Sequence, residues 1–145
     1  IGLVGAAPKL QENEYHGGSL EDKLLKSHSK ILIDLRGRTN LIELAGASRT
    51  AKAVISVDAG PMHISAGVGT PTLAIVGNDK NGDGVSPIRL WLPRNECLDR
   101  TISSYTSTYF SENNFRNDDL PEANRCMKGV HPDQVINWLK KILTK

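Results

Sequence analysis

The 145-residue chain lacks the features that mark several classes of protein. Two cysteines, Cys97 and Cys126, are too few for a disulfide framework and lack metal-ligand spacing, so we expect free thiols in a reducing, cytoplasmic setting. A net charge of +2 with no dense Lys/Arg block argues against nucleic acid as a partner. No apolar run is long enough to be a transmembrane segment, no signal peptide is visible, and no acidic cluster requires a metal ion.

The composition is that of a globular protein, with 39% apolar residues, 23% charged residues and 13 glycines. The length suits a single domain over residues 1–145. The chain begins without methionine and inside an apolar pattern, so we expect it to be one domain of a longer protein.

Four short apolar runs, at residues 1–4, 31–35, 54–57 and 72–76, predict strands, the first buried on both faces. Helical patterns alternate with them. Such alternation predicts an α/β fold with a Rossmann-like parallel sheet covered by helices on both faces.

Capping and helix-breaking residues predict where the helices begin and end. Ser19 is a candidate cap, followed by Glu21 and Asp22 in a first turn where the helix dipole favours acids. Asn40 is a second candidate cap, ahead of a helix that we expect to turn four apolar residues toward a core. These are Leu41, Ile42, Leu44 and Ala45. A third helix, at 62–68, should stop at Gly69 and Pro71.

After the fourth predicted strand, the sequence predicts a long irregular segment and then one helix. Residues 77–125 are rich in Asn, Asp, Ser and Gly and predict a long irregular segment. A final helix is expected at 132–144, with lysines near its end and an apolar face. That face is predicted to contain Val135, Ile136, Leu139, Ile142 and Leu143.

The stretch VDAGPMHISA, at 57–66, leaves a predicted strand and enters a helix. Pro61 suits the first helical position, which would make Gly60 the cap, where the missing Cβ lets a ligand approach the backbone. The amides of Gly60, Met62 and His63 would then be unpaired within the helix. Ligands of open parallel sheets bind beyond the carboxyl ends of strands, so the turn predicts an anion site suited to phosphate.

Two side chains of this turn have alternative interpretations. Asp58 either accepts backbone hydrogen bonds that fix the turn, which we favour because a carboxylate repels phosphate, or meets a ligand hydroxyl. His63 either donates to a phosphate oxygen or is a core histidine bonded to a backbone carbonyl. These residues indicate an anion site and no particular reaction.

Several motifs in order resemble glycosyltransferase family 9, the heptosyltransferases of lipopolysaccharide core synthesis. Residues 37–45, GRTNLIELA, are similar to the family's GkTsLxELA, and 58–64 to its D-(T/S)-G-P-M-H-L. Residues 66–71, AGVGTP, are similar to the family's A-x-G-x-P turn, and RCMKGV at 125–130 resembles the family's closing motif. The resemblance covers most of residues 30–78 and 125–143.

The resemblance implies a GT-B glycosyltransferase with two Rossmann-like halves, of which this chain is similar to the C-terminal, donor-binding half. It implies ADP-heptose or a similar sugar nucleotide as donor and no metal cofactor. Asp58, Ala59, Gly60, Met62 and His63 would then line the diphosphate and sugar. The adenine would lie near Thr39, the ribose near Glu12 or Glu14, and the phosphates near Lys9.

Three departures from the family pattern matter. Ala59 replaces the usual Thr or Ser, which removes one hydroxyl donor, and Gly77, Asn78 and Asp79 replace the family's fGPT. The family's catalytic carboxylate belongs to the N-terminal half, so we expect no catalytic base and no transfer by this chain alone.

The implied reaction is an inverting sugar transfer to a lipid-linked or oligosaccharide acceptor, bound through the other half. Growing negative charge on the leaving diphosphate would be stabilised by the helix start and His63. The implied location is the cytoplasm, with peripheral contact at the inner membrane through the basic end of the last helix as an alternative to a solvated helix face. A donor with another nucleotide, and a non-catalytic nucleotide-binding module, stay open as alternatives.

Overall fold

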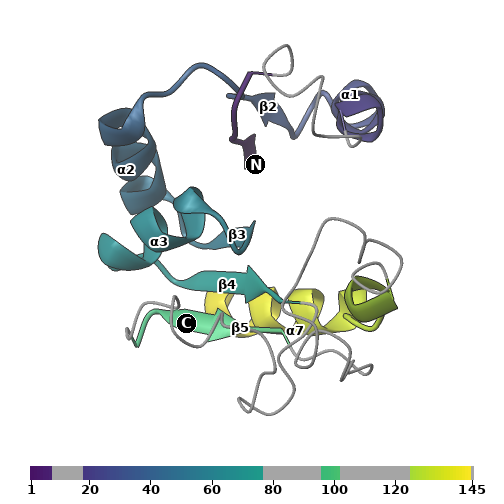
Figure 1. The fold of residues 1–145 in the computed structure, drawn as a ribbon, viewed down its shortest axis with the longest axis vertical. Helices are drawn as coiled ribbons and strands as arrows, with labels where there is room; N and C mark the ends of the chain where they lie inside the picture. Colours follow the sequence, from purple (N-terminus) through teal and green to yellow (C-terminus); the bar gives the residue numbers. More distant parts are fainter. Residues whose placement is uncertain (8–17, 77–95, 102–124, 145) are drawn as a thin grey trace, which may run out of the picture. The chain divides into compact units, whose positions relative to one another are not determined.

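The structure is a computed structural model, and it describes residues 1–7, 18–76, 96–101 and 125–144. Its elements follow the predicted α/β alternation (Figure 1). They are β1 (Gly2–Leu3), α1 (Gly18–Ser27), β2 (Ile33–Asp34), α2 (Leu41–Thr50), β3 (Val54–Val57), α3 (Gly60–Gly67), β4 (Thr72–Ile75), β5 (Leu98–Arg100) and α7 (Pro132–Leu143). Contacts divide the chain into two compact units, Ile1–Ala47 and Ser48–Lys145.

In the first unit, β1 and β2 form a two-stranded parallel sheet. Backbone hydrogen bonds extend the pairing beyond the strands, from Ile33 N to Ile1 O at 2.9 Å and from Gly37 N to Gly5 O at 2.8 Å. The prediction that residues 1–4 are buried on both faces is wrong here, because Ile1 is 79% exposed and Leu3 is only partly buried. A two-stranded sheet has no central strand that neighbours could cover on both sides.

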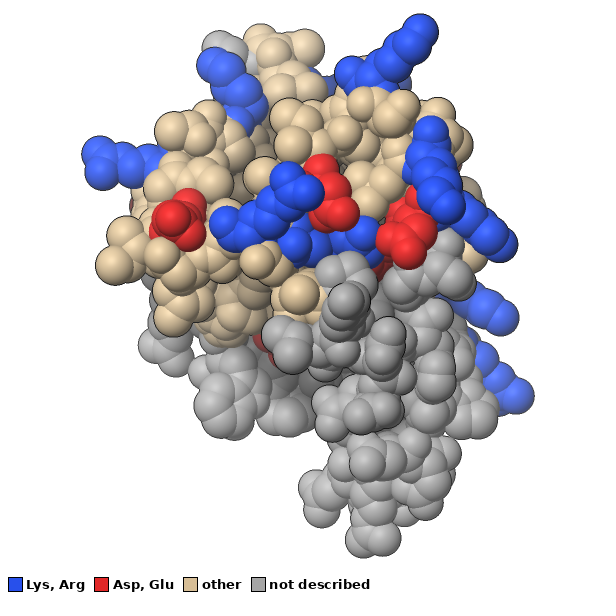
Figure 2. Space-filling model, turned by 90° about the horizontal axis from the view of Figure 1, so that it is seen from above, with Lys and Arg blue, Asp and Glu red and all other residues tan. Residues whose placement is uncertain are grey.

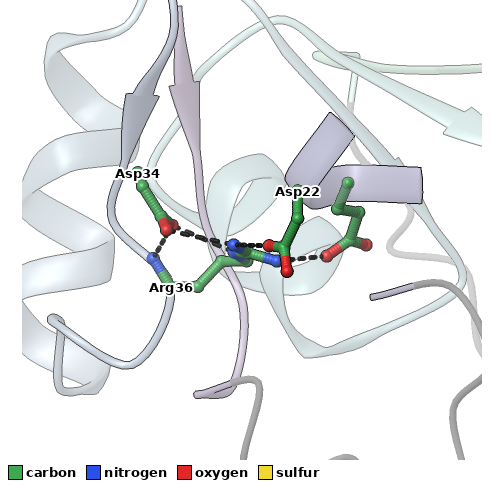
Figure 3. A network of polar contacts seen from close by, with 4 residues as sticks. Asp22, Asp34 and Arg36 are labelled. Carbon is green, nitrogen blue, oxygen red and sulfur yellow. Dashed lines mark hydrogen bonds and ion pairs between the residues drawn. The ribbon is translucent and has the colours of Figure 1, made fainter. Parts of the chain in front are cut away.

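Arg36, just after β2, is a buried charged residue of this unit, and Figure 3 shows its polar contacts. Its guanidinium donates to Glu21 Oε2 and Asp22 Oδ1, both at 2.8 Å, and to both carboxylate oxygens of Asp34 at 3.0 Å. Hydrogen bonds from the Arg36 side chain, and next from its backbone N–H, lower the pKa of Asp34 to about 2. Glu21, in the first turn of α1, and Asp22 after it therefore have a specific partner, beyond the helix dipole that their positions suggested.

The second unit contains a parallel sheet in the order β3-β4-β5. The central strand, β4, is almost wholly buried, as expected for a strand with neighbours on both sides (Figure 1). Beyond its end, Val76 N donates to the hydroxyl of Thr101 at 2.9 Å, while Thr101 N donates to Ala74 O. These two hydrogen bonds, one to a side chain and one to the backbone, hold the residues after β5 against the end of β4.

Helices lie on both faces of this sheet. Thr72 pairs with Leu98 and Leu73 with Asp99, so the first pair faces one side and the second pair the other. Met62 of α3 packs with Ala74, Val76 and Leu98 on the first side. On the second side, Trp138 Nε1 of α7 donates to Asp99 Oδ2 at 2.6 Å. This arrangement confirms the predicted fold class, a Rossmann-like parallel sheet between helices.

The start of α2 confirms Asn40 as a cap. Asn40 Oδ1 accepts the amides of Ile42 and Glu43 at 2.9 Å, and Glu43 Oε2 accepts the amide of Asn40 at 2.8 Å. This reciprocal pair is a capping box. The predicted core face is wrong at Leu41 and Ile42, which are 73% and 84% exposed, because the buried residue of α2 is Ser48 in its last turn.

Other predicted features have mixed outcomes. Helix α1 already includes Gly18, so Ser19 lies inside the helix and is not its cap. The helix α7 starts at Pro132 with His131 as cap, close to prediction, but Ile136 and Leu143 are exposed, and Trp138 occupies the buried position. Cys97 and Cys126 are not joined by a disulfide, as expected. None of the helices in the described ranges has the length and hydropathy of a membrane-spanning segment.

Candidate functional site

The candidate site is the turn from β3 into α3, at the carboxyl end of a parallel strand. Helix α3 begins at Gly60, with Pro61 in its first turn, and its cap residue is Ala59 in an extended conformation (φ −156°, ψ 166°). The prediction that Gly60 is the cap is therefore wrong by one position. Ala59 has no side-chain oxygen, and no side chain caps this helix.

The amides of the first turn differ from one another. Met62 N donates to Ala59 O at 2.9 Å, so the prediction that this amide is unpaired is wrong. Pro61 has no N–H. The Gly60 amide lies at the first helical position, which an α-helix leaves without an intrahelical acceptor. Of the three amides from which the anion site was predicted, the structure therefore pairs the one of Met62, which leaves the amides of Gly60 and His63 and the dipole of an eight-residue helix.

Gly60 is a glycine that the fold itself does not require. Its φ lies outside the positive range, and among the described residues a Cβ built on it would meet no atom within 4 Å beyond its chain neighbours and the backbone of its own helix. Gly69, in contrast, ends the same helix with a φ of +81°. The open space beside the Gly60 backbone is the approach that a ligand would need.

His63 and Asp58 face each other at the site. The distance from His63 Nε2 to Asp58 Oδ1 is 3.8 Å, too long for a hydrogen bond, and the two side chains are 40% and 44% exposed. This exposure contradicts the core interpretation of His63. No backbone amide of the described residues is bonded to the Asp58 carboxylate, so the turn-fixing role has no support there, and a ligand hydroxyl stays open as its partner.

The remaining predicted site residues are Met62, Thr39, Lys9, Glu12 and Glu14. The Met62 side chain is fully buried in the core, so only its backbone lies at the turn. Thr39 is partly buried between β2 and α2, and it belongs to the first unit. Lys9, Glu12 and Glu14 lie outside the described residues.

The charge around the described surface is mixed. On the face seen in Figure 2, Lys and Arg side chains are interspersed with Asp and Glu. Within the described ranges, no group of three His, Cys, Asp or Glu side chains has the geometry of a metal site. The phosphate-binding potential of the turn therefore depends on Gly60, His63 and the helix dipole.

Sequence reasoning missed the polar residues behind the turn. Ser65 and Ser48 are buried, and their hydroxyl oxygens lie 3.0 Å apart. Ser65 Oγ also donates to Pro61 O at 2.7 Å. A serine three residues after Met62 on the buried side of a short helix was the available signal, because an apolar residue is the usual choice there.

Sheet topology and helix placement define an α/β protein with a Rossmann-like fold, whose candidate site lies at the end of a parallel strand. Residues 10–96, more than half of the chain, match the model of glycosyltransferase family 9 (heptosyltransferase). The chain belongs to this family. Neither curated protein sequences nor solved structures gave a match to the chain.

Proposed function

We propose that this chain is the donor-binding half of an inverting, metal-independent glycosyltransferase that uses ADP-heptose or a similar sugar nucleotide in lipopolysaccharide core synthesis. Family membership supports glycosyl transfer as the reaction class. The donor diphosphate binds at the start of α3, against the Gly60 amide and the His63 imidazole. Asp58 accepts a hydrogen bond from a sugar hydroxyl.

The observation that carries this proposal is the open space at Gly60. A glycine with an ordinary helical conformation and no crowding neighbour costs helix stability without helping the fold. Gly67 has the same open space, and what distinguishes Gly60 is its place in the first turn of α3, at the carboxyl end of β3, where a ligand can approach the backbone. In the transfer step the leaving diphosphate gains negative charge, which the helix dipole and a hydrogen bond donated by the His63 ring stabilise most in the transition state.

The test compares Gly60→Ala with Gly67→Ala in the same helix, because neither added methyl group meets an atom within 4 Å. Isothermal titration with ADP and ADP-heptose should show binding to the wild-type chain and to Gly67→Ala. Gly60→Ala should weaken binding at least about tenfold, equivalent to about 1.4 kcal/mol, without lowering Tm. Equal affinity of the two variants would remove Gly60 from the site, and a wild-type chain that binds neither ligand would refute donor binding.

A non-catalytic nucleotide-binding module is the second candidate, and Ala59 favours it. The cap position has no hydroxyl for a phosphate or for the helix start. A donor with another nucleotide, such as a UDP sugar, is distinguished by the same titration. In either case we expect the 145-residue chain to bind without transferring sugar, and turnover by the purified chain would contradict this expectation.

We further propose cytoplasmic placement, with α7 touching the inner membrane near a lipid-linked acceptor. Ile136, Lys140 and Leu143 are exposed at helical spacing, which combines apolar and basic groups on one face. Vesicles with anionic lipid should retain more protein than neutral vesicles, and Lys140→Glu should abolish the difference. Equal retention by both kinds of vesicle would exclude this contact.

A further inference from the structure

A chain of buried hydroxyl groups connects three segments around α3. Thr70 Oγ1, before β4, donates to Ser48 O at 2.8 Å. The Ser48 and Ser65 hydroxyl oxygens are 3.0 Å apart, and Ser65 Oγ lies 2.7 Å from Pro61 O. All three hydroxyl-bearing residues are at most 5% exposed. The last turn of α2, the first turn of α3 and the entry to β4 are therefore tied together.

The direction of these bonds follows from counting hydrogens. Each serine hydroxyl has one hydrogen to donate and two lone pairs. Pro61 O can only accept, so Ser65 uses its hydrogen there, at the shorter distance. The Ser48 hydroxyl then donates to Ser65 Oγ. Hydrogen bonds in such a series polarise and strengthen one another in a buried setting.

The end of this series lies directly behind the candidate site. Pro61 O belongs to the peptide group between Pro61 and Met62, in the first turn of α3. A helical carbonyl at this position already accepts an amide four residues later, so the Ser65 hydroxyl adds a second constraint on its direction. A tilt of the Pro61 carbonyl would turn the first turn of α3, and with it the Gly60 amide and the His63 side chain.

Filling space does not explain these hydroxyl groups. Ser65 is fully buried and follows Met62 by three residues in α3, so an alanine methyl would fill this position without a polar atom. Replacing both members of a buried hydrogen-bonded pair by apolar groups is often close to neutral for stability, whereas replacing one leaves the other unsatisfied.

We propose that Ser48 and Ser65 are positioning residues, which hold the first turn of α3 in the orientation that binds the donor diphosphate. This inference rests on the proposed function, because the diphosphate is the ligand for which the turn is held. Neither serine touches the ligand.

The double variant Ser48→Ala/Ser65→Ala separates positioning from stability. Ser65→Ala alone should lower Tm, because the Ser48 hydroxyl loses its acceptor, and the double variant should restore much of that loss. The ADP dissociation constant, measured by isothermal titration, should nevertheless stay at least about fivefold above wild type in the double variant. Trp138→Phe is the control: it removes a hydrogen bond on the other side of the sheet, so it should lower Tm with unchanged ADP affinity.

Hydrogen exchange supplies a readout that needs no ligand. The amides of Met62 and His63 should exchange at least about fivefold faster in the double variant than in the wild type, while those of β4 keep their rates. A double variant with wild-type affinity and wild-type exchange at these amides would overturn the proposal. A wild-type chain that ignores ADP would refute the proposed function instead, and the exchange rates would then decide alone whether the serines hold the turn.

Discussion

Replacing Gly37 with alanine should destabilise the first unit strongly for its size. Gly37 has a φ of +66°, and an added Cβ would lie 2.6 Å from the Cβ and 2.9 Å from the Cα of Ala7. Left-handed backbone costs a non-glycine residue about 1–2 kcal/mol. Moving Ala7 away would also disturb the bond from Gly37 N to Gly5 O, worth about 0.5–1.5 kcal/mol net. The expected loss is therefore about 1.5–3.5 kcal/mol.

Urea unfolding followed by circular dichroism measures this loss, and hydrogen exchange of peptides spanning 1–7 and 31–38 assigns it to the strand pair. Gly46→Ala is the matched control, because Gly46 lies inside α2 with no atom within 4 Å of an added Cβ. This control should gain up to about 1 kcal/mol from helix propensity. Equal midpoints for wild type and Gly37→Ala would refute the reasoning, since both the positive φ and the contact with Ala7 would then be wrong.

Two further predictions concern the charge network and the core. The folded-state pKa of Asp34 is about 2 against an ordinary 3.8, so its contribution to stability is complete above about pH 4 and lost as the pH falls toward 2. Acid unfolding of Asp34→Asn should lack this component; a parallel acid profile for wild type and variant would contradict the pairing with Arg36. Met62→Ala should cost about 2–5 kcal/mol in urea unfolding, because Met62 is fully buried against Ala74 and Val76, and a loss below about 1 kcal/mol would show that the site collapses around the cavity.

Local patterns predicted the second unit well. The strand patterns at 54–57 and 72–76, and the turn after the first of them, are local in sequence. In the first unit, the cap of α2 was predictable for the same reason, because Asn40 and Glu43 are three residues apart. The candidate site benefits from the same locality, since Asp58, Ala59, Gly60 and His63 share one turn. Its details depend on where the first helical hydrogen bond forms, and this shifted the cap from Gly60 to Ala59.

Features that depend on distant partners were not predictable. β5 has the sequence Leu-Asp-Arg, which contains no apolar run, and it becomes a strand by pairing with β4. Asp99 of this strand accepts a hydrogen bond from Trp138 of α7, and the local sequence does not indicate a partner that lies 39 residues away. The acids of α1 suggested a dipole effect because nothing in their spacing identifies Arg36, which follows Asp22 by fourteen residues.

The alanine at the start of α3 has a thermodynamic consequence. A serine or threonine cap would contribute about 1 kcal/mol to the helix start at all times, whereas Ala59 contributes no such bond. A bound diphosphate would take the place of the cap, so part of the order of this turn would be present only in the complex. Saturating ligand should then raise Tm and slow amide exchange most at the start of α3, by the linkage between binding and folding. In this chain, the ligand would complete a piece of secondary structure that the sequence leaves unfinished.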